Sequence, residues 1–328
     1  MDKLVSVIIP VYNVADYLQQ IIDDLVKQEL INFEVLLIDD GSTDGSGDLC
    51  DSIASQSPLH VRVIHQKNGG LSAARNKGIE AAKGRYLTFI DPDDRINSNF
   101  LSYLFALIQK SNCSMSVCSH MIVRGGKKSL GTDNSVEYDI VTADSFIEGL
   151  LYRQRYDTSA WAKMYDERLF RDVRFPVGTL YEDLGTTYKL AIKAEKICVG
   201  NQANYFYLIR DKSITNAKFS NNQLDFIEVT QQMKSEVDKL YPALISATAE
   251  RLVFSYISTL TKTFNSQQNK DLKAVQVKLV DFIIKNKKDI INNSKSSIRD
   301  KLSVYLLMTV RLTGFRVFWK CYEGLRRI

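Results

Sequence analysis

The chain has 328 residues, of which 45% are hydrophobic and 25% charged, and its formal net charge is +5. This composition predicts a soluble globular protein with one large domain and an appendage, or with two domains. The excess positive charge lies in residues 298–328, where seven Lys and Arg face two acidic residues, so a broad nucleic-acid-binding surface is excluded.

Membrane-spanning, disulfide-bonded and zinc-binding classes are also disfavoured. No signal peptide is recognisable at the N-terminus, and the C-terminal apolar run Leu302–Val310 is far shorter than the roughly 20 residues of a membrane span. The five cysteines are an odd number without C-x-x-C spacing, and the three histidines show no metal-ligand spacing. We therefore expect a cytoplasmic protein in a reducing compartment.

Short β-rich runs alternate with helical periodicity through the first part of the chain. Asn13 is the expected N-cap of the first helix, and Gly84 the expected stop of the third. This alternation predicts βαβ units and a mainly parallel sheet. The expected strands are 4–10, 33–38, 61–65 and 86–90, and helices are expected after the first three.

From about Ala217 the apolar periodicity is helical only. Phe226, Val229, Met233 and Val237 recur at helical spacing, and a second such series begins at Ile245. We therefore predict a first domain of residues 1–216 and a helical domain of residues 217–328.

Two acidic segments follow predicted strands, at the sheet edge where ligands of open α/β sheets bind. The first, IDDGSTDGSGD at 38–48, has no phosphate-loop pattern and only an imperfect calcium-loop pattern. It is compatible with a nucleoside site, or with an Asp-rich turn and helix cap. The second, DPDD at 91–94, is either a solvated turn or a site whose carboxylates need a cation.

Four segments together resemble the family-2 glycosyltransferases with the GT-A fold. They are SVIIPVYN (6–13), IDDGSTDGS (38–46), NGGLSAARNKGIEAAKGRYLTFIDPDD (68–94) and YED (181–183), in this order along the first two-thirds of the chain. The resemblance implies a Rossmann-like, mainly parallel α/β sheet of the nucleotide-diphospho-sugar transferase type. It also implies sugar transfer with inversion from a nucleotide sugar.

The resemblance assigns the donor side of the site residue by residue. Asp40 is expected to accept the uracil N–H of a UDP-sugar, and Arg75 to lie near the nucleotide. Pro10 and Tyr12 match positions that frame the nucleoside. Asp91 is expected to face the ribose.

The same motif region implies a divalent cation. Asp93 and Asp94 match the positions that bind Mn²⁺ or Mg²⁺, hard cations that prefer oxygen ligands. Such an ion stabilises a diphosphate leaving group as a Lewis acid.

An inverting transfer also needs a base for the acceptor hydroxyl. In the family the Asp of the ED pair has this role, so Asp183 is the expected base and Glu182 its supporting residue.

Two further segments are similar to family segments. In SAWAKMYDERLF (159–170), Trp161 is expected either to stack on an acceptor sugar or to be a buried core residue. In YFYLIRDKSIT (205–215), Arg210 and Ser213 are candidates for contacting the diphosphate, although Leu208 stands where many relatives have a basic residue.

The C-terminal segment combines aromatic and basic residues on one predicted helical face, comprising Phe315, Phe318, Trp319, Tyr322 and Leu325. Such a helix suits an anionic membrane surface, so residues 298–328 are expected to make a peripheral contact with the inner face of a bacterial membrane. The alternative is a helix packed on its own domain or on a second subunit of a homo-oligomer.

The sequence therefore predicts a metal-dependent glycosyltransferase that acts on a cell-surface glycan or a lipid-linked oligosaccharide acceptor, as in capsule or exopolysaccharide synthesis. One alternative is a non-catalytic subunit that keeps the fold as a partner or scaffold. Another is a nucleotidyltransferase, but PVYNVADY lacks the Gly-rich basic loop expected after its first strand.

Overall fold

The computed structural model describes residues 4–131, 137–154, 156–209 and 219–327. The chain divides into two compact units. Unit 1 comprises Met1–Leu150, Gln154–Gly178 and Glu182–Asp211, and unit 2 comprises Leu151–Arg153, Thr179–Tyr181 and Lys212–Ile328. The predicted boundary at 216/217 falls outside the described residues and stays a prediction.

Unit 1 is an α/β unit built on a sheet whose main path of strands is β3-β2-β1-β4-β9-β6-β10-β5, with β7 paired to β6 and β8 to β10 off this path. Strands β3, β2, β1 and β4 are parallel, whereas β9 pairs antiparallel with both β4 and β6. The predicted α/β fold with a parallel core is confirmed. The strands are β1 Val5–Val11, β2 Phe33–Asp39, β3 Val61–His65, β4 Tyr86–Phe89, β5 Arg95–Ile96, β6 Met115–Arg124, β7 Lys127–Leu130, β8 Tyr138–Thr142, β9 Lys163–Asp166 and β10 Lys196–Ile209.

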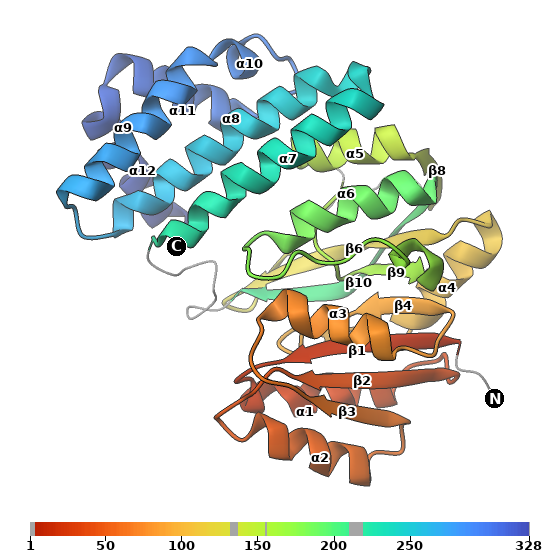
Figure 1. Cartoon of the computed structure of the whole chain (residues 1–328). Helices are drawn as coiled ribbons and strands as arrows, with labels where there is room; N and C mark the ends of the chain where they lie inside the picture. Colours follow the sequence, from red (N-terminus) through yellow and green to blue (C-terminus); the bar gives the residue numbers. More distant parts are fainter. Residues whose placement is uncertain (1–3, 132–136, 155, 210–218, 328) are drawn as a thin grey trace. The chain divides into compact units, whose positions relative to one another are not determined.

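Helices cover both faces of this sheet, with α1 and α2 on the side opposite α3 (Figure 1). Alternate residues of β1 pack towards α1, and Ile8 faces Gly78 of α3. A Cβ on Gly78 would lie 2.3 Å from Ile8 Cγ2, so this close approach requires glycine. The helices are α1 Ala15–Val26, α2 Ser46–Gln56, α3 Leu71–Ala81, α4 Phe100–Ser111, α5 Ala143–Tyr152 and α6 Glu182–Ala194.

The predicted N-cap of the first helix is wrong. Asn13 has a φ of 52° and its side chain accepts a hydrogen bond from Thr43 N, while α1 begins at Ala15. The N–H groups of Val14 and Ala15 instead donate to Ser46 Oγ and Asp44 Oδ2. The helix start is thus capped by a loop about 30 residues away rather than by its own sequence.

Unit 2 is helical, as predicted for this part of the chain. Its core combines Val253, Ile257 and Leu260 of α8 with apolar residues of the surrounding helices. The apolar series that begins at Ile245 lies on α8, as expected for a helix, although Ile245 itself is 49% exposed. The helices are α7 Asp225–Leu240, α8 Ile245–Lys262, α9 Lys270–Lys285, α10 Lys288–Ile291, α11 Ile298–Thr309 and α12 Arg311–Arg327.

The aromatic face predicted on the last helix lies on α12, and part of it packs within unit 2, while membrane contact stays a prediction. Phe315 is fully buried and Trp319 packs against the helical core. The aromatic residues of α12 therefore include those that attach the helix to its own unit. None of the described helices is long and apolar enough to cross a membrane.

The buried carboxylate of Glu34 in β2 is hydrogen-bonded to residues of the neighbouring strands β1 and β3. Glu34 is fully buried and accepts hydrogen bonds from Ser6 Oγ (2.7 Å), Arg62 Nη1 (2.9 Å) and Lys83 N (2.8 Å). Burial alone would raise the pKa of Glu34, but these hydrogen bonds and the charge of Arg62 leave it lowered. The ionised carboxylate is therefore the form that stabilises the fold.

Glu34→Gln should lower the free energy of unfolding at pH 7 by about 1–3 kcal/mol, because the amide cannot replace a charge-assisted acceptor. A lowered carboxyl pKa contributes stability above the unfolded-state pKa, and this contribution is lost as pH falls through the folded-state pKa. The difference from wild type should therefore shrink on acidification in urea-unfolding curves. Glu80→Gln, at an exposed pair with Lys77, is the control, and equal losses in both variants would contradict the assignment.

Candidate active site

The carboxyl edge of the parallel strands brings the first predicted residues together. In the β1–β2 ladder Pro10 lies opposite Ile38 and Val11 opposite Asp39, so the residues that follow these strands are neighbours. Pro10 is buried, whereas the Tyr12 side chain is 49% exposed just beyond the strand. Tyr12 is thus available to a ligand at this edge.

Asp40 holds the loop that leads into α3. It is 3% exposed and accepts hydrogen bonds from Gln66 Nε2 (2.6 Å), Gly69 N (2.9 Å) and Gly70 N (2.7 Å). A carboxylate has about four acceptor positions, so these donors leave room for roughly one more. The Asp40 side chain is therefore fixed in place with little spare acceptor capacity.

Other carboxylates of the first acidic segment, and Asp51 just after it, make separate hydrogen bonds. Asp44 accepts from Ser46 and Ala15, while Asp39 and Asp51 lie 2.8 and 3.1 Å from the two ring nitrogens of His65. These two carboxylates raise the pKa of His65, with Asp39 the larger cause. Among the described residues no three His, Cys, Asp or Glu gather as a metal cage.

The DPDD turn after β4 places its carboxylates in different surroundings. Asp91 and Asp93 are half-buried, whereas Asp94 is 1% exposed. Asp94 accepts hydrogen bonds from the Tyr205 hydroxyl (2.7 Å) and from Leu208 N (2.9 Å). Burial and the nearby charge of Asp91 raise the pKa of Asp94 well above its usual range. Asp94 thus ties the turn to β10.

Arg75 joins three of the predicted segments. Its guanidinium, only 1% exposed, donates to Asp91 Oδ1 (3.1 Å), Glu182 Oε1 (2.9 Å) and Asp183 Oδ1 (2.7 Å). The guanidinium carbon lies 5.3 Å from the centre of the Phe175 ring. The predicted DPDD and YED carboxylates therefore meet on one buried cation, which comes from the AARN segment of α3.

Asp183 has the proton affinity of a general base. Burial raises its pKa, Arg75 opposes that effect, and the charges of Glu182 and Asp91 add to it, so that the pKa is about 7. Lys163 also lowers this pKa. A carboxylate poised near neutrality at a strand-end site is typical of a catalytic group.

Comparison with known proteins identifies the family. The model of the family described as "Glycosyl transferase family 2" matches residues 6–174, which is half of the chain. The chain belongs to glycosyl transferase family 2. The resemblance noted in the sequence is thereby confirmed, as is the assignment of the chain as a glycosyltransferase.

Curated relatives of this family 2 enzyme include two glycosyltransferases of Streptococcus pneumoniae serotype 4. GlyG is 32% identical over 72% of this chain and 81% of its own length. GlyA is 33% identical over 66% of this chain, but the match spans only 32% of GlyA.

The fold has a close counterpart among solved structures. Residues 1–349 of TarS from S. aureus, crystallised with UDP-GlcNAc, superpose with a TM-score of 0.67 at 21% identity, over 98% of this chain and 92% of the TarS chain. This likeness confirms the GT-A fold class.

The donor set of the DPDD turn fits a divalent cation of the predicted kind. Mg²⁺ and related hard cations usually take one or two protein carboxylates together with substrate phosphates and water, rather than a full protein cage. The half-buried Asp93 suits this arrangement. Both oxygens of Asp94 already accept hydrogen bonds, so a metal ion bound by Asp94 would have to share one of these oxygens. The metal role of Asp94 stays a prediction.

Trp161 lies in the surroundings expected of a core residue. It is 7% exposed, stacks on Tyr205 with ring centroids 4.6 Å apart, and also stacks on Tyr207. This packing favours the buried alternative over stacking on an acceptor sugar. Arg210 and Ser213 lie outside the described residues.

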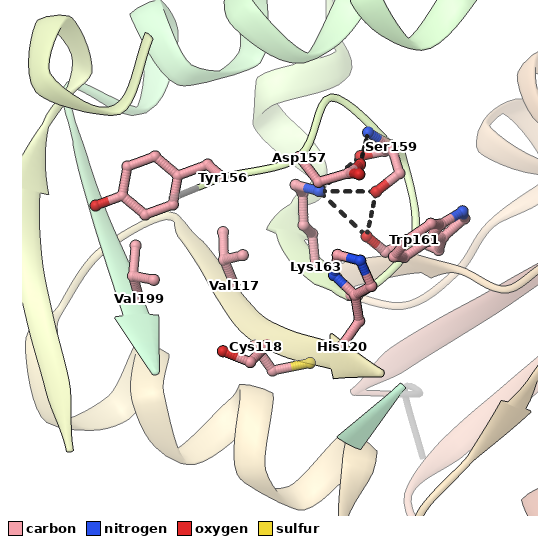
Figure 2. Close-up of a pocket in the computed structure, with 11 residues that line it drawn as sticks. Val117, Cys118, His120, Tyr156, Asp157, Ser159, Trp161, Lys163 and Val199 are labelled. Carbon is pink, nitrogen blue, oxygen red and sulfur yellow. Dashed lines mark hydrogen bonds between the residues drawn. The ribbon is translucent and has the colours of Figure 1, made fainter. Parts of the chain in front are cut away.

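Lys163 was missed as a site residue by the sequence analysis. Figure 2 shows its ammonium beside the turn before β9, where it donates to Ser159 O (2.7 Å), Ser159 Oγ (3.2 Å) and Trp161 O (3.3 Å). Burial lowers the pKa of Lys163 despite the charge of Asp157. A lysine within the apolar run SAWAKMY was the available signal, since lysine is rarely buried without partners.

Arg75→Met should reduce the free energy of unfolding by about 3–5 kcal/mol, because it leaves three closely spaced, partly buried carboxylates without their buried cation. Denaturant titration at neutral pH measures this loss. Arg85→Met, at a side chain that is 64% exposed, is the matched control and should change stability far less. Similar stabilities of the two variants would show that the Arg75 cluster does not hold the segments together.

Proposed function

We propose that this enzyme transfers a sugar with inversion from a UDP-sugar to a cell-surface glycan or lipid-linked oligosaccharide, with Mn²⁺ or Mg²⁺ bound at the donor diphosphate. The observation that carries this proposal is the meeting of Asp91, Glu182 and Asp183 on Arg75, with the pKa of Asp183 at about 7. The fold shared with a UDP-GlcNAc-bound TarS supports the donor class.

The donor side follows from the strand-end residues. Pro10 and Tyr12 frame the nucleoside, and Asp40 uses its remaining acceptor capacity for the uracil N–H. Asp91 faces the ribose hydroxyls. When bound, the divalent cation supplies Lewis-acid stabilisation of the charge that develops on the diphosphate.

The chemical step assigns the proton to Asp183. As the acceptor oxygen forms its bond to the anomeric carbon, the bond from that carbon to the diphosphate oxygen breaks and the nucleoside diphosphate leaves. Asp183 takes the proton of the acceptor hydroxyl. Arg75 orients the carboxylate, and Glu182 supports it by raising its proton affinity.

Asp183→Asn should reduce transfer by about 10²–10⁴-fold, the usual contribution of a general base, while binding of the donor is retained. Product formation with a panel of UDP-sugars and Mn²⁺ gives the rate, and ligand-observed NMR gives the binding. Asp172→Asn, at a side chain that is 70% exposed, is the control.

Undiminished turnover in Asp183→Asn would remove the base assignment. If no UDP-sugar bound to wild type, with or without Mn²⁺, the donor assignment would fail. Donor binding without transfer or donor hydrolysis across a wide acceptor panel would favour the non-catalytic alternative.

The rate of transfer should rise as pH increases through about 7, because the base must be ionised to accept a proton. Lys163→Met removes a positive charge that lowers the pKa of Asp183. The midpoint of the variant's pH–rate profile should therefore move to higher pH by about 0.5–1 unit. The pH dependence of the single-turnover rate measures both. Lys77→Met, at an exposed side chain of α3, should leave the midpoint unchanged, and an unmoved midpoint in Lys163→Met would contradict the coupling.

A further inference from the structure

Helix α11 of unit 2 presents an apolar stripe to solvent. Ile298 is 86% exposed, Leu302 43%, Tyr305 48% and Met308 42%. Their spacings of four, three and three residues place them along one side of the helix. The opposite side, with Val304 and Leu307, is packed into the core of unit 2. The stripe is therefore a surface of a folded unit rather than a loose segment.

Cationic side chains accompany this stripe along its length. Lys295 and Arg311, both exposed, lie just before and just after α11, and the half-buried Lys301 lies one turn from Ile298 and Tyr305. Lysine can extend its charge from an apolar surface to polar headgroups.

No exposed carboxylate offsets these cations in residues 295–322. The one acidic residue of this stretch is Asp300, which is 1% exposed and paired with Arg153 Nη2 at 2.6 Å. The α11 surface, which we define as Ile298, Leu302, Tyr305 and Met308 with Lys295, Lys301 and Arg311, is thus apolar and positive.

We propose that the α11 surface docks on an anionic lipid bilayer, with its apolar side chains entering the headgroup region and its cations contacting lipid phosphates. The 12-residue helix is too short to span a membrane, but a helix that lies in the plane of the interface needs no such length. A second copy of the chain fits less well, because pairing of this surface with itself would bring the same cations together without exposed carboxylates.

Apart from Lys295, this surface lies within the segment 298–328 for which the sequence suggested membrane contact, but it is a different face of that segment. The sequence placed membrane contact on the aromatic face of residues 315–325, whereas Phe315 and Trp319 pack within unit 2. The inference concerns membrane binding alone and depends on neither the donor nor the acceptor of the proposed reaction.

Vesicle co-sedimentation of the full chain tests the proposal. The protein should bind vesicles of phosphatidylglycerol and phosphatidylcholine more tightly than vesicles of phosphatidylcholine alone, and high salt should weaken binding. Ile298→Ser and Leu302→Ser should each reduce the partition coefficient by about 3–10-fold, and Lys301→Gln by about fivefold.

Matched controls distinguish binding by this surface from nonspecific binding of exposed apolar residues and from misfolding. Ile31→Ser, at a side chain that is 87% exposed in unit 1, and Val277→Ser, at one that is 54% exposed on α9, should bind vesicles like wild type. Circular dichroism should show unchanged thermal unfolding for all variants, because the substituted side chains are exposed or charged surface groups.

Absence of binding to anionic vesicles would overturn the proposal, as would undiminished binding by Ile298→Ser/Leu302→Ser. A dimer in analytical ultracentrifugation that this double variant converts to a monomer would instead assign the surface to a second copy. Vesicle binding that is lost in the double variant while UDP-sugar binding is unchanged would support membrane docking whatever the outcome for the reaction.

Discussion

The guanidinium of Arg75 holds three carboxylates, from the turn after β4 and from the first turn of α6, at one point. Closely spaced, partly buried carboxylates repel one another and are disfavoured without a cation, so the site depends on this one side chain. Glu182 and Asp183 are more than 100 residues from Arg75 in sequence. Their position beside the sheet edge is thus set by an ion cluster as well as by the strands and helices that carry them.

The same cluster sets the proton affinity of Asp183. If Arg75 were the only influence on Asp183, the carboxylate would be a weak base, because a nearby cation lowers its pKa. Burial and the charges of Glu182 and Asp91 outweigh that effect and bring the pKa to about 7. The pKa of Asp183 therefore results from opposing contributions, and the buried Lys163 also lowers it.

The features predicted well from the sequence were local and strongly periodic. The first strands have continuous apolar runs, and their motifs are contiguous, so both the sheet and the family were recognisable. Features determined by distant contacts were missed. The cap of α1 comes from Ser46 and Asp44, and the partners of Arg75 depend on how α3 and α6 pack. For the α12 aromatics the sequence left membrane contact and packing on their own unit as alternatives, because periodicity identifies an apolar face without showing what covers it.

The hydrogen bonds of Asp40 to the start of α3 affect how substitutions at this site should be interpreted. Its carboxylate binds Gly69 N and Gly70 N at the start of α3, and Arg75 lies in the next turns of that helix. The proposed nucleoside contact of Asp40 and the Arg75 contact to the proposed base Asp183 therefore depend on one short segment. A substitution of Asp40 would therefore also change the position of the proposed base. A defect there would combine recognition and turnover, and only residues outside this segment, such as Tyr12, can report on recognition alone.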